Sequence, residues 1–232
     1  MKTMELRRVP YGTTFTAFGD QFVALDYIGG GVLAIRKETW KNAAFDSNGV
    51  NDLRSASIGQ ALEDYLNTLK DGGAKISDIL NMTIDLKATD GTREYGFHET
   101  KIGLLTLEQY GKYQHIIPDV EECWWLATPW RTPGEKCGHS TYAWYVNSNG
   151  YASSYVYCSY AGYYLRPALI LSPSLLTSID DEAEQPAGKT EAETYAEYCA
   201  YVMDWAGYAE EGGQDQGTSP LTYEEWKEEN EG

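Results

Sequence analysis

The chain has 232 residues and a formal net charge of −17 at pH 7, which is enough length for one sizeable domain with additional segments. The charge is uneven, because residues 180–232 contain 16 acidic and two basic residues, whereas residues 1–179 contain 19 acidic and 16 basic residues. The nearly neutral body has no basic stripe, so nucleic-acid binding is not expected. No apolar stretch reaches the length of a membrane span, and the first residues lack the apolar core of a secretory signal.

The first half of the chain predicts a hairpin and a helix. Residues 21–28 and 32–37 read as strands, and the glycines between them supply the positive φ that a tight hairpin needs. Apolar residues recur at helical spacing over residues 57–69, which predicts a helix with one buried face. Residues 82–97 alternate around a turn at Asp90-Gly91 and predict a second hairpin.

The middle of the chain predicts a second helix and then strands. Thr106 is a capping residue, and Gln109 follows three positions later, the spacing of a capping box. From Cys123 to Leu171 the sequence reads as strands and loops.

A run of 23 residues, 142–164, contains eight tyrosines and no charged residue. We call it the tyrosine run. Its other residues are mostly small and polar, a mixture typical of antibody-like binding surfaces, where tyrosine gives contact area at low entropic cost. Ordinary strands are the alternative, since tyrosine also favours strands. We expect the run to project outward as a ligand-binding patch, formed by Tyr142, Trp144, Tyr151, Ser153, Ser154, Tyr155, Tyr157, Ser159, Tyr160 and Tyr163.

Three motifs stand before, inside and after this run: W-W-L-A-T-P at 124–129, Y-V-N-S-N-G at 145–150 and L-R-P-A-L at 165–169. This ordered set resembles a domain family of unassigned function, common in proteins of clostridial prophages and gut bacteria. The fold of that family is related to the C-type lectins and to the formylglycine-generating enzymes. The resemblance covers residues 9–172. It implies an α+β, C-type-lectin-like domain with a twisted, mainly antiparallel sheet and two helices.

The resemblance also implies roles for the motif residues. Arg166 is expected to hydrogen-bond several loop carbonyls, because its guanidinium carries five donors. The remaining motif positions are expected to be largely buried: Trp124, Trp125, Leu126, Val146, Pro167, Ala168 and Leu169.

Relatives of this fold are diversified by retroelements that mutate adenines, and the resulting palette of Tyr, Ser, Asn, Asp, His, Cys, Gly and Ala fits residues 142–164, including Cys158. We therefore expect Cys158 at the surface. The resemblance implies a phage or prophage receptor-binding or adhesin protein, whose partner is a host-cell surface protein or glycan. It would be found in the virion, on the phage tail, or in the cytoplasm of the producing bacterium.

Two other functions are open. The chain could be a structural virion component without a ligand, in which the tyrosine run packs against neighbours. It could also be an enzyme of the formylglycine-generating type, which the cysteine positions disfavour, so no catalytic residue is assigned. The cysteines and histidines lack metal-site spacing, and the calcium motifs of sugar-binding C-type lectins do not occur. We expect no metal and no cofactor.

The composition changes after the last motif. We expect a domain over residues 1–173, a polar linker over 174–189, a helix over 190–209 and a flexible acidic tail with a short terminal helix over 210–232. Aromatic side chains in these segments could pack on the parent domain or on other virion proteins: Tyr198, Tyr201, Trp205 and Trp226.

Overall fold

The glycine hairpin lies within the largest sheet of the molecule. In the computed structural model, which describes residues 2–133 and 140–179, strand β3 (Asp20–Ile28) pairs with strand β4 (Gly31–Arg36). Gly29 and Gly30 have φ values of 58° and 78°, as a two-residue turn of this hairpin type requires. A Cβ on Gly31 would lie 2.6 Å from Ile170 Cγ2, so the neighbouring strand approaches too closely for any other residue.

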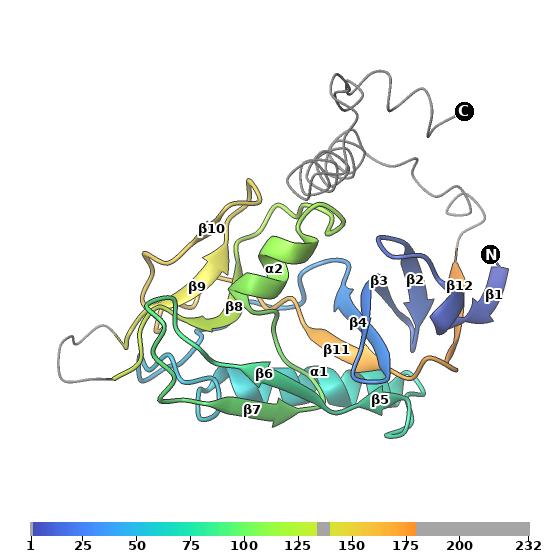
Figure 1. Ribbon diagram of the computed structural model, residues 1–232, viewed down its shortest axis with the longest axis horizontal. Coiled ribbons are helices and arrows are strands. Elements are labelled where there is room, and N and C mark those ends of the chain that lie inside the picture. Colours follow the sequence, from blue (N-terminus) through green and yellow to red (C-terminus); the bar gives the residue numbers. More distant parts are fainter. Residues whose placement is uncertain (1, 134–139, 180–232) are drawn as a thin grey trace, which may run out of the picture. The chain divides into compact units, whose positions relative to one another are not determined.

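The strands of the described residues form three sheets (Figure 1). The large sheet has seven strands in the order β1-β12-β2-β3-β4-β11-β5, with β1 at Lys2–Glu5, β2 at Thr14–Ala17, β5 at Ile79–Leu80, β11 at Ala168–Leu171 and β12 at Leu176–Ile179. A second sheet has the order β10-β9-β8, with β8 at Trp124–Pro129, β9 at Ala143–Val146 and β10 at Ala152–Ser153. Strands β6 (Met82–Asp85) and β7 (Phe97–Thr100) form the third, and a 3₁₀ turn covers Leu6–Arg8.

All pairs between these strands are antiparallel. The expected α+β class, with two α-helices and mainly antiparallel sheets, is confirmed for the described residues. Of these helices, none is long and apolar enough to cross a membrane.

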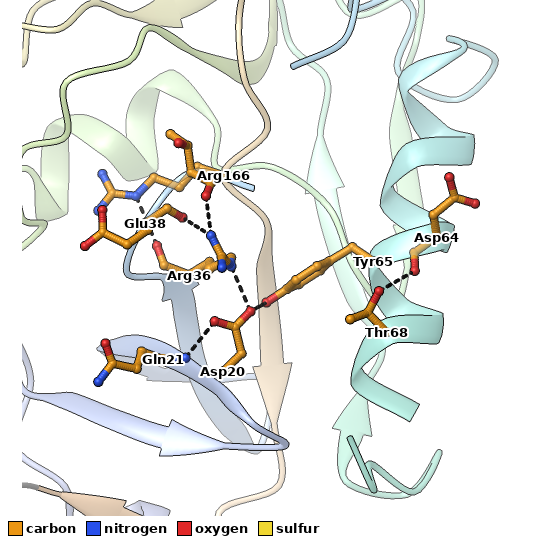
Figure 2. A network of polar contacts seen from close by, with 9 residues as sticks. Asp20, Gln21, Arg36, Glu38, Asp64, Tyr65, Thr68 and Arg166 are labelled. Atoms are coloured by element: carbon orange, nitrogen blue, oxygen red, sulfur yellow. Dashed lines mark hydrogen bonds and ion pairs between the residues drawn. The ribbon is translucent and has the colours of Figure 1, made fainter. Parts of the chain in front are cut away.

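Helix α1 (Ile58–Asp71) confirms the helix expected over residues 57–69 and buries one face, including Ile58, Leu62 and Tyr65. Figure 2 shows how its tyrosine reaches the large sheet. Tyr65 Oη and Arg36 Nε both donate to Asp20 Oδ2 at 2.7 Å. This shared carboxylate fixes the helix to β3 and β4 at once.

Helix α2 (Leu107–Tyr113) begins with the predicted capping box of Thr106 and Gln109. Lys112 Nζ and Tyr113 Oη both donate to Asp26 Oδ2 on β3. At the other end of the helix, Leu107 N donates to Thr128 Oγ1 on β8 at 2.8 Å. The short helix α2 therefore joins the large sheet to the three-stranded sheet.

The second predicted hairpin exists with a different second strand. Strand β6 pairs with β7 from Met82↔Thr100 to Asp85↔Phe97, so residues 86–96 form a long connection rather than a strand. In that connection Asp85 Oδ1 accepts from Lys87 N and Asp90 Oδ1 accepts from Thr92 N. Such local bonds from aspartate to backbone compete with the ladder of a sheet, which explains the shift.

The expected domain boundary at residue 173 is wrong. The chain divides into units of residues 1–183 and 184–232, and every described residue belongs to the first. Residues 176–179, expected as linker, form β12, which pairs with both β1 and β2 and buries Thr177 and Ile179. The polar composition of the segment obscured a short alternating strand. The expected helix over 190–209 and the tail over 210–232 lie outside the described residues, with Tyr198, Tyr201, Trp205 and Trp226.

Candidate ligand-binding surface

The motif residues that were expected to be buried form a frame inside the domain. Trp124, Trp125, Leu126, Val146, Pro167, Ala168 and Leu169 are all buried. The guanidinium of Arg166 is also buried and donates to the carbonyl oxygens of Arg36, at 3.0 Å, and Lys37. It lies 5.2 Å from the ring centre of Trp124. Burial lowers the pKa of Arg166 to about 10, which leaves it charged at neutral pH, so it ties β11 to the end of β4.

The Y-V-N-S-N-G motif covers the end of β9 and the turn that leads to β10. Asn147 Oδ1 accepts from Asn149 N at 2.9 Å and from Tyr151 N at 3.0 Å. Gly150 has a φ of 75°, a conformation that favours glycine, and its carbonyl accepts from Tyr110 Oη on α2 at 2.7 Å. The turn that leads into the exposed part of the tyrosine run is therefore held by hydrogen bonds within it and by one hydrogen bond from α2.

Four tyrosines of the run are strongly exposed. The exposed fractions are 85% for Tyr155, 71% for Tyr151, 58% for Tyr157 and 52% for Tyr160, and Ser159 is exposed beside them. Outward projection is thus confirmed for these five predicted site residues. Large aromatic side chains usually bury most of their area in a folded protein, so their exposure marks this segment as a candidate contact surface.

The other predicted site residues are less exposed than expected. Tyr142, Trp144, Ser153 and Tyr163 are each partly buried, and Ser154 is buried. Tyr163 packs on Trp125 and Tyr145, with ring centres 5.0 and 4.5 Å away. These residues therefore connect the exposed rings to the frame, because the run needs an apolar underside to hold its position.

Two pairs of rings join an exposed tyrosine to a partly buried one. The ring of Tyr157 stacks on that of Tyr142 with centres 4.7 Å apart, across an isolated antiparallel bridge between the two residues. The ring of Tyr160 meets that of Tyr163 edge-on at 5.1 Å. Trp144 packs on Trp130 at 5.8 Å, and its buried Nε1 has no hydrogen-bond partner among the described residues.

Cys158 is buried, so the expectation of a surface thiol is wrong. It is 0% exposed, its N–H donates to Thr141 O at 2.8 Å, and its carbonyl accepts from Asp46 N at 3.0 Å. Burial raises the pKa of its thiol to about 12, which keeps the thiol neutral. Cysteine is small and apolar, which suits this core position. The composition of the run gave no sign that Cys158 would be buried.

Sequence reasoning missed two residues that hold the run in place. Asn51 is buried, and its Nδ2 donates to the carbonyl oxygens of Arg131 and Tyr142, while its Oδ1 accepts from Tyr95 Oη. Asp46, also buried, accepts backbone N–H groups through both carboxylate oxygens. Polar residues in a loop normally face water. The local signal in the sequence is Asn48-Gly49, a turn-forming pair that lies between Asp46 and Asn51.

A cavity of about 250 Å³ lies apart from these residues, between α2, β8 and the connection after β6, with Asp85, Lys87, Glu108 and Thr128 in its wall. Thr128 Oγ1 already accepts from Leu107 N, and Asp85 Oδ2 already accepts from Arg93. Thr128 and Asp85 are thus engaged in holding the fold, and we take the exposed tyrosines rather than this cavity as the candidate binding site.

Within the described residues no group of three or more His, Cys, Asp or Glu side chains could hold a metal ion. Cys137 and His139 lie outside the described residues. Comparisons of the chain with protein-family models, with curated proteins and with solved structures find no match.

Proposed function

We propose that this chain is a phage or prophage ligand-binding protein, of the receptor-binding or adhesin type, which uses the tyrosine run as its contact surface. The observation that carries the proposal is the contrast within one segment. Tyr151, Tyr155, Tyr157 and Tyr160 are exposed, while Val146 before them and residues 165–169 after them are buried. Function carried by a loop on a rigid scaffold is a common arrangement for binding proteins.

The C-type-lectin-like fold and retroelement diversification are parts of this proposal. They are supported by the order of the three motifs and by the mixture of Tyr, Ser, Asn, Gly and Ala in residues 142–164. Substitutions at exposed positions of the run cost little folding free energy, typically within about 0.5 kcal/mol, so the frame tolerates variation there. Sequencing the surrounding genome tests this part: a reverse-transcriptase gene beside an adenine-rich copy of the segment supports it, and a genome without either contradicts it.

The partner in this proposal is a protein or glycan on a host cell. The test is a screen of the purified full chain against intact cells of gut bacteria and against immobilised glycans, with Tyr155→Ala/Tyr160→Ala as the comparison. Binding that requires these two rings supports the proposal. A structural virion component would instead bind other virion proteins and show the tyrosine run covered when an assembled particle is labelled at tyrosine.

A further inference from the structure

We propose that residues 47–50, which we call loop 47–50, form one continuous interface with the tyrosine run, and that the partner of this interface is a folded protein. The inference rests on the proposed function, because it extends the same binding surface. It adds Ser47, Asn48 and Val50 to that surface.

Backbone hydrogen bonds place residues 42–51 beside the second half of the tyrosine run and beside the residues that precede it. Asn42 forms an antiparallel bridge with Tyr164, and Ala43 N donates to Tyr163 O at 2.9 Å. Farther along, Asp46 N donates to Cys158 O at 3.0 Å. Beyond the loop, Asn51 N donates to Ser140 O at 2.9 Å. Loop 47–50 is therefore held at both ends against backbone that leads directly to Tyr157 and Tyr142.

Loop 47–50 is rigid because two of its backbone N–H groups donate hydrogen bonds to the buried carboxylate of Asp46. Asp46 Oδ2 accepts from Asn48 N at 3.1 Å and from Val50 N at 3.0 Å, and Oδ1 accepts from Ser57 N at 2.9 Å. Gly49 completes the turn with a φ of 77° and an N–H bond to Asp46 O. A loop with this many internal bonds loses little conformational entropy when a partner binds.

The side chains of the loop face solvent and carry no charge. Val50 is 40% exposed, and Ser47 and Asn48 are exposed as well. The tyrosine run also contains no charged residue, and the carboxylate of Asp46 is occupied by backbone N–H groups. The combined surface offers aromatic faces, one aliphatic side chain, amides and hydroxyls, so it fits an uncharged partner surface rather than a polyanion.

The size of the surface favours a protein over a sugar. A buried aromatic side chain contributes roughly 150–250 Å², and a standard protein interface buries about 800 Å² per partner. The four exposed tyrosines supply most of that area, and loop 47–50 extends it. Among the described residues no other aromatic ring stacks on Tyr151 or Tyr155, which are 71% and 85% exposed, so these two rings suit pockets in a partner, as aromatic anchors of protein interfaces do.

The test measures binding of the fluorescently labelled full chain to intact gut-bacterial cells by flow cytometry. The variant is Val50→Arg, with Asn48→Arg as a second position in the loop. The matched control is Ile76→Arg, because Ile76 is likewise an exposed aliphatic residue, at 59%, and lies just before β5. Figure 1 shows β5 in the lower part of the view, right of centre, and the β9–β10 hairpin at the upper left. Melting temperatures of all variants should stay within about 3 °C of the wild type.

We expect Val50→Arg and Asn48→Arg to raise the concentration for half-maximal binding at least about tenfold, and Ile76→Arg to leave it unchanged. Protease treatment of the cells should abolish binding, and periodate oxidation of their glycans should not. Binding that depends on Tyr155 but tolerates both loop variants overturns the inference and leaves the proposed function standing. Binding that is lost with periodate and kept after protease overturns the protein partner. Absence of wild-type binding to every strain overturns the proposed function itself.

Discussion

Asn51 Nδ2 lies 2.7 Å from the carbonyl oxygen of Tyr142, the first residue of the tyrosine run. The two residues are far apart in sequence, and the amide that joins them is buried. The same nitrogen donates to Arg131 O at 2.8 Å, and the amide oxygen accepts from Tyr95 Oη at 2.7 Å. One side chain thus joins a loop, the connection after β8 and the start of the tyrosine run.

We predict that Asn51→Asp lowers the free energy of unfolding by about 2–4 kcal/mol, because its carboxylate would face the two carbonyl oxygens without a donor. Asn48→Asp is the matched control, since it makes the same chemical change at an exposed position, where surface substitutions cost within about 0.5 kcal/mol. Urea denaturation of both variants provides the measurement. Equal stability losses in the two variants would mean that the buried amide has no special role.

The sequence predicted the elements whose signals are local. Adjacent glycines indicated the β3–β4 hairpin, the spacing of Ile58, Leu62 and Tyr65 indicated α1, and Thr106 with Gln109 indicated the capping box of α2. Each signal depends on neighbours within a few residues. The motif order similarly anticipated which residues of β8 and β11 are buried.

The contacts between distant segments could not be read in this way. Nothing near Asn51 or Asp46 shows that the tyrosine run lies against them, and nothing near Cys158 shows that its side chain turns inward. Strand β12 was missed because its segment is polar and because its pairing partners, β1 and β2, lie near the start of the chain. The composition of residues 142–164 separated this segment from the frame but did not say which tyrosines face outward.

We predict a pH-dependent contribution from the cluster around Asp26. Partial burial by itself raises the pKa of Asp26, but hydrogen bonds from Lys112, Tyr113 and the N–H of Tyr27 outweigh it, so the pKa lies below the ordinary 3.8. A depressed folded-state pKa gives stability that is complete above the unfolded value and is lost as the pH falls through the folded value.

Asp26→Asn should therefore lower the free energy of unfolding by about 1–2 kcal/mol at pH 7. The difference from the wild type should stay constant down to about pH 5 and shrink below about 3.8. Melting curves of both proteins from pH 7 to pH 2 test this expectation. A difference that is constant or grows in acid would contradict the assigned role of Asp26.

Strand β12 leads to a prediction about truncation. A chain that ends after Pro173 lacks β12, leaves β1 without its partner, and exposes area covered by Ile179, a loss of about 1.5–3 kcal/mol for that side chain. Its melting temperature should fall by at least about 5 °C. A chain that ends after Ala183, the limit of the first unit, should melt within about 2 °C of the full chain. Equal loss in both would mean that the tail contributes to the domain core.

The central claim is that the exposed tyrosines bind a partner while the buried frame maintains the fold. The most direct measurement pairs the melting temperature with cell-surface binding for Tyr155→Ala and Tyr160→Ala. We predict a loss of binding equivalent to roughly 1–4 kcal/mol for each variant, with the free energy of unfolding changed by less than about 1 kcal/mol. A large loss of stability in both variants, or unchanged binding in both, would contradict the claim.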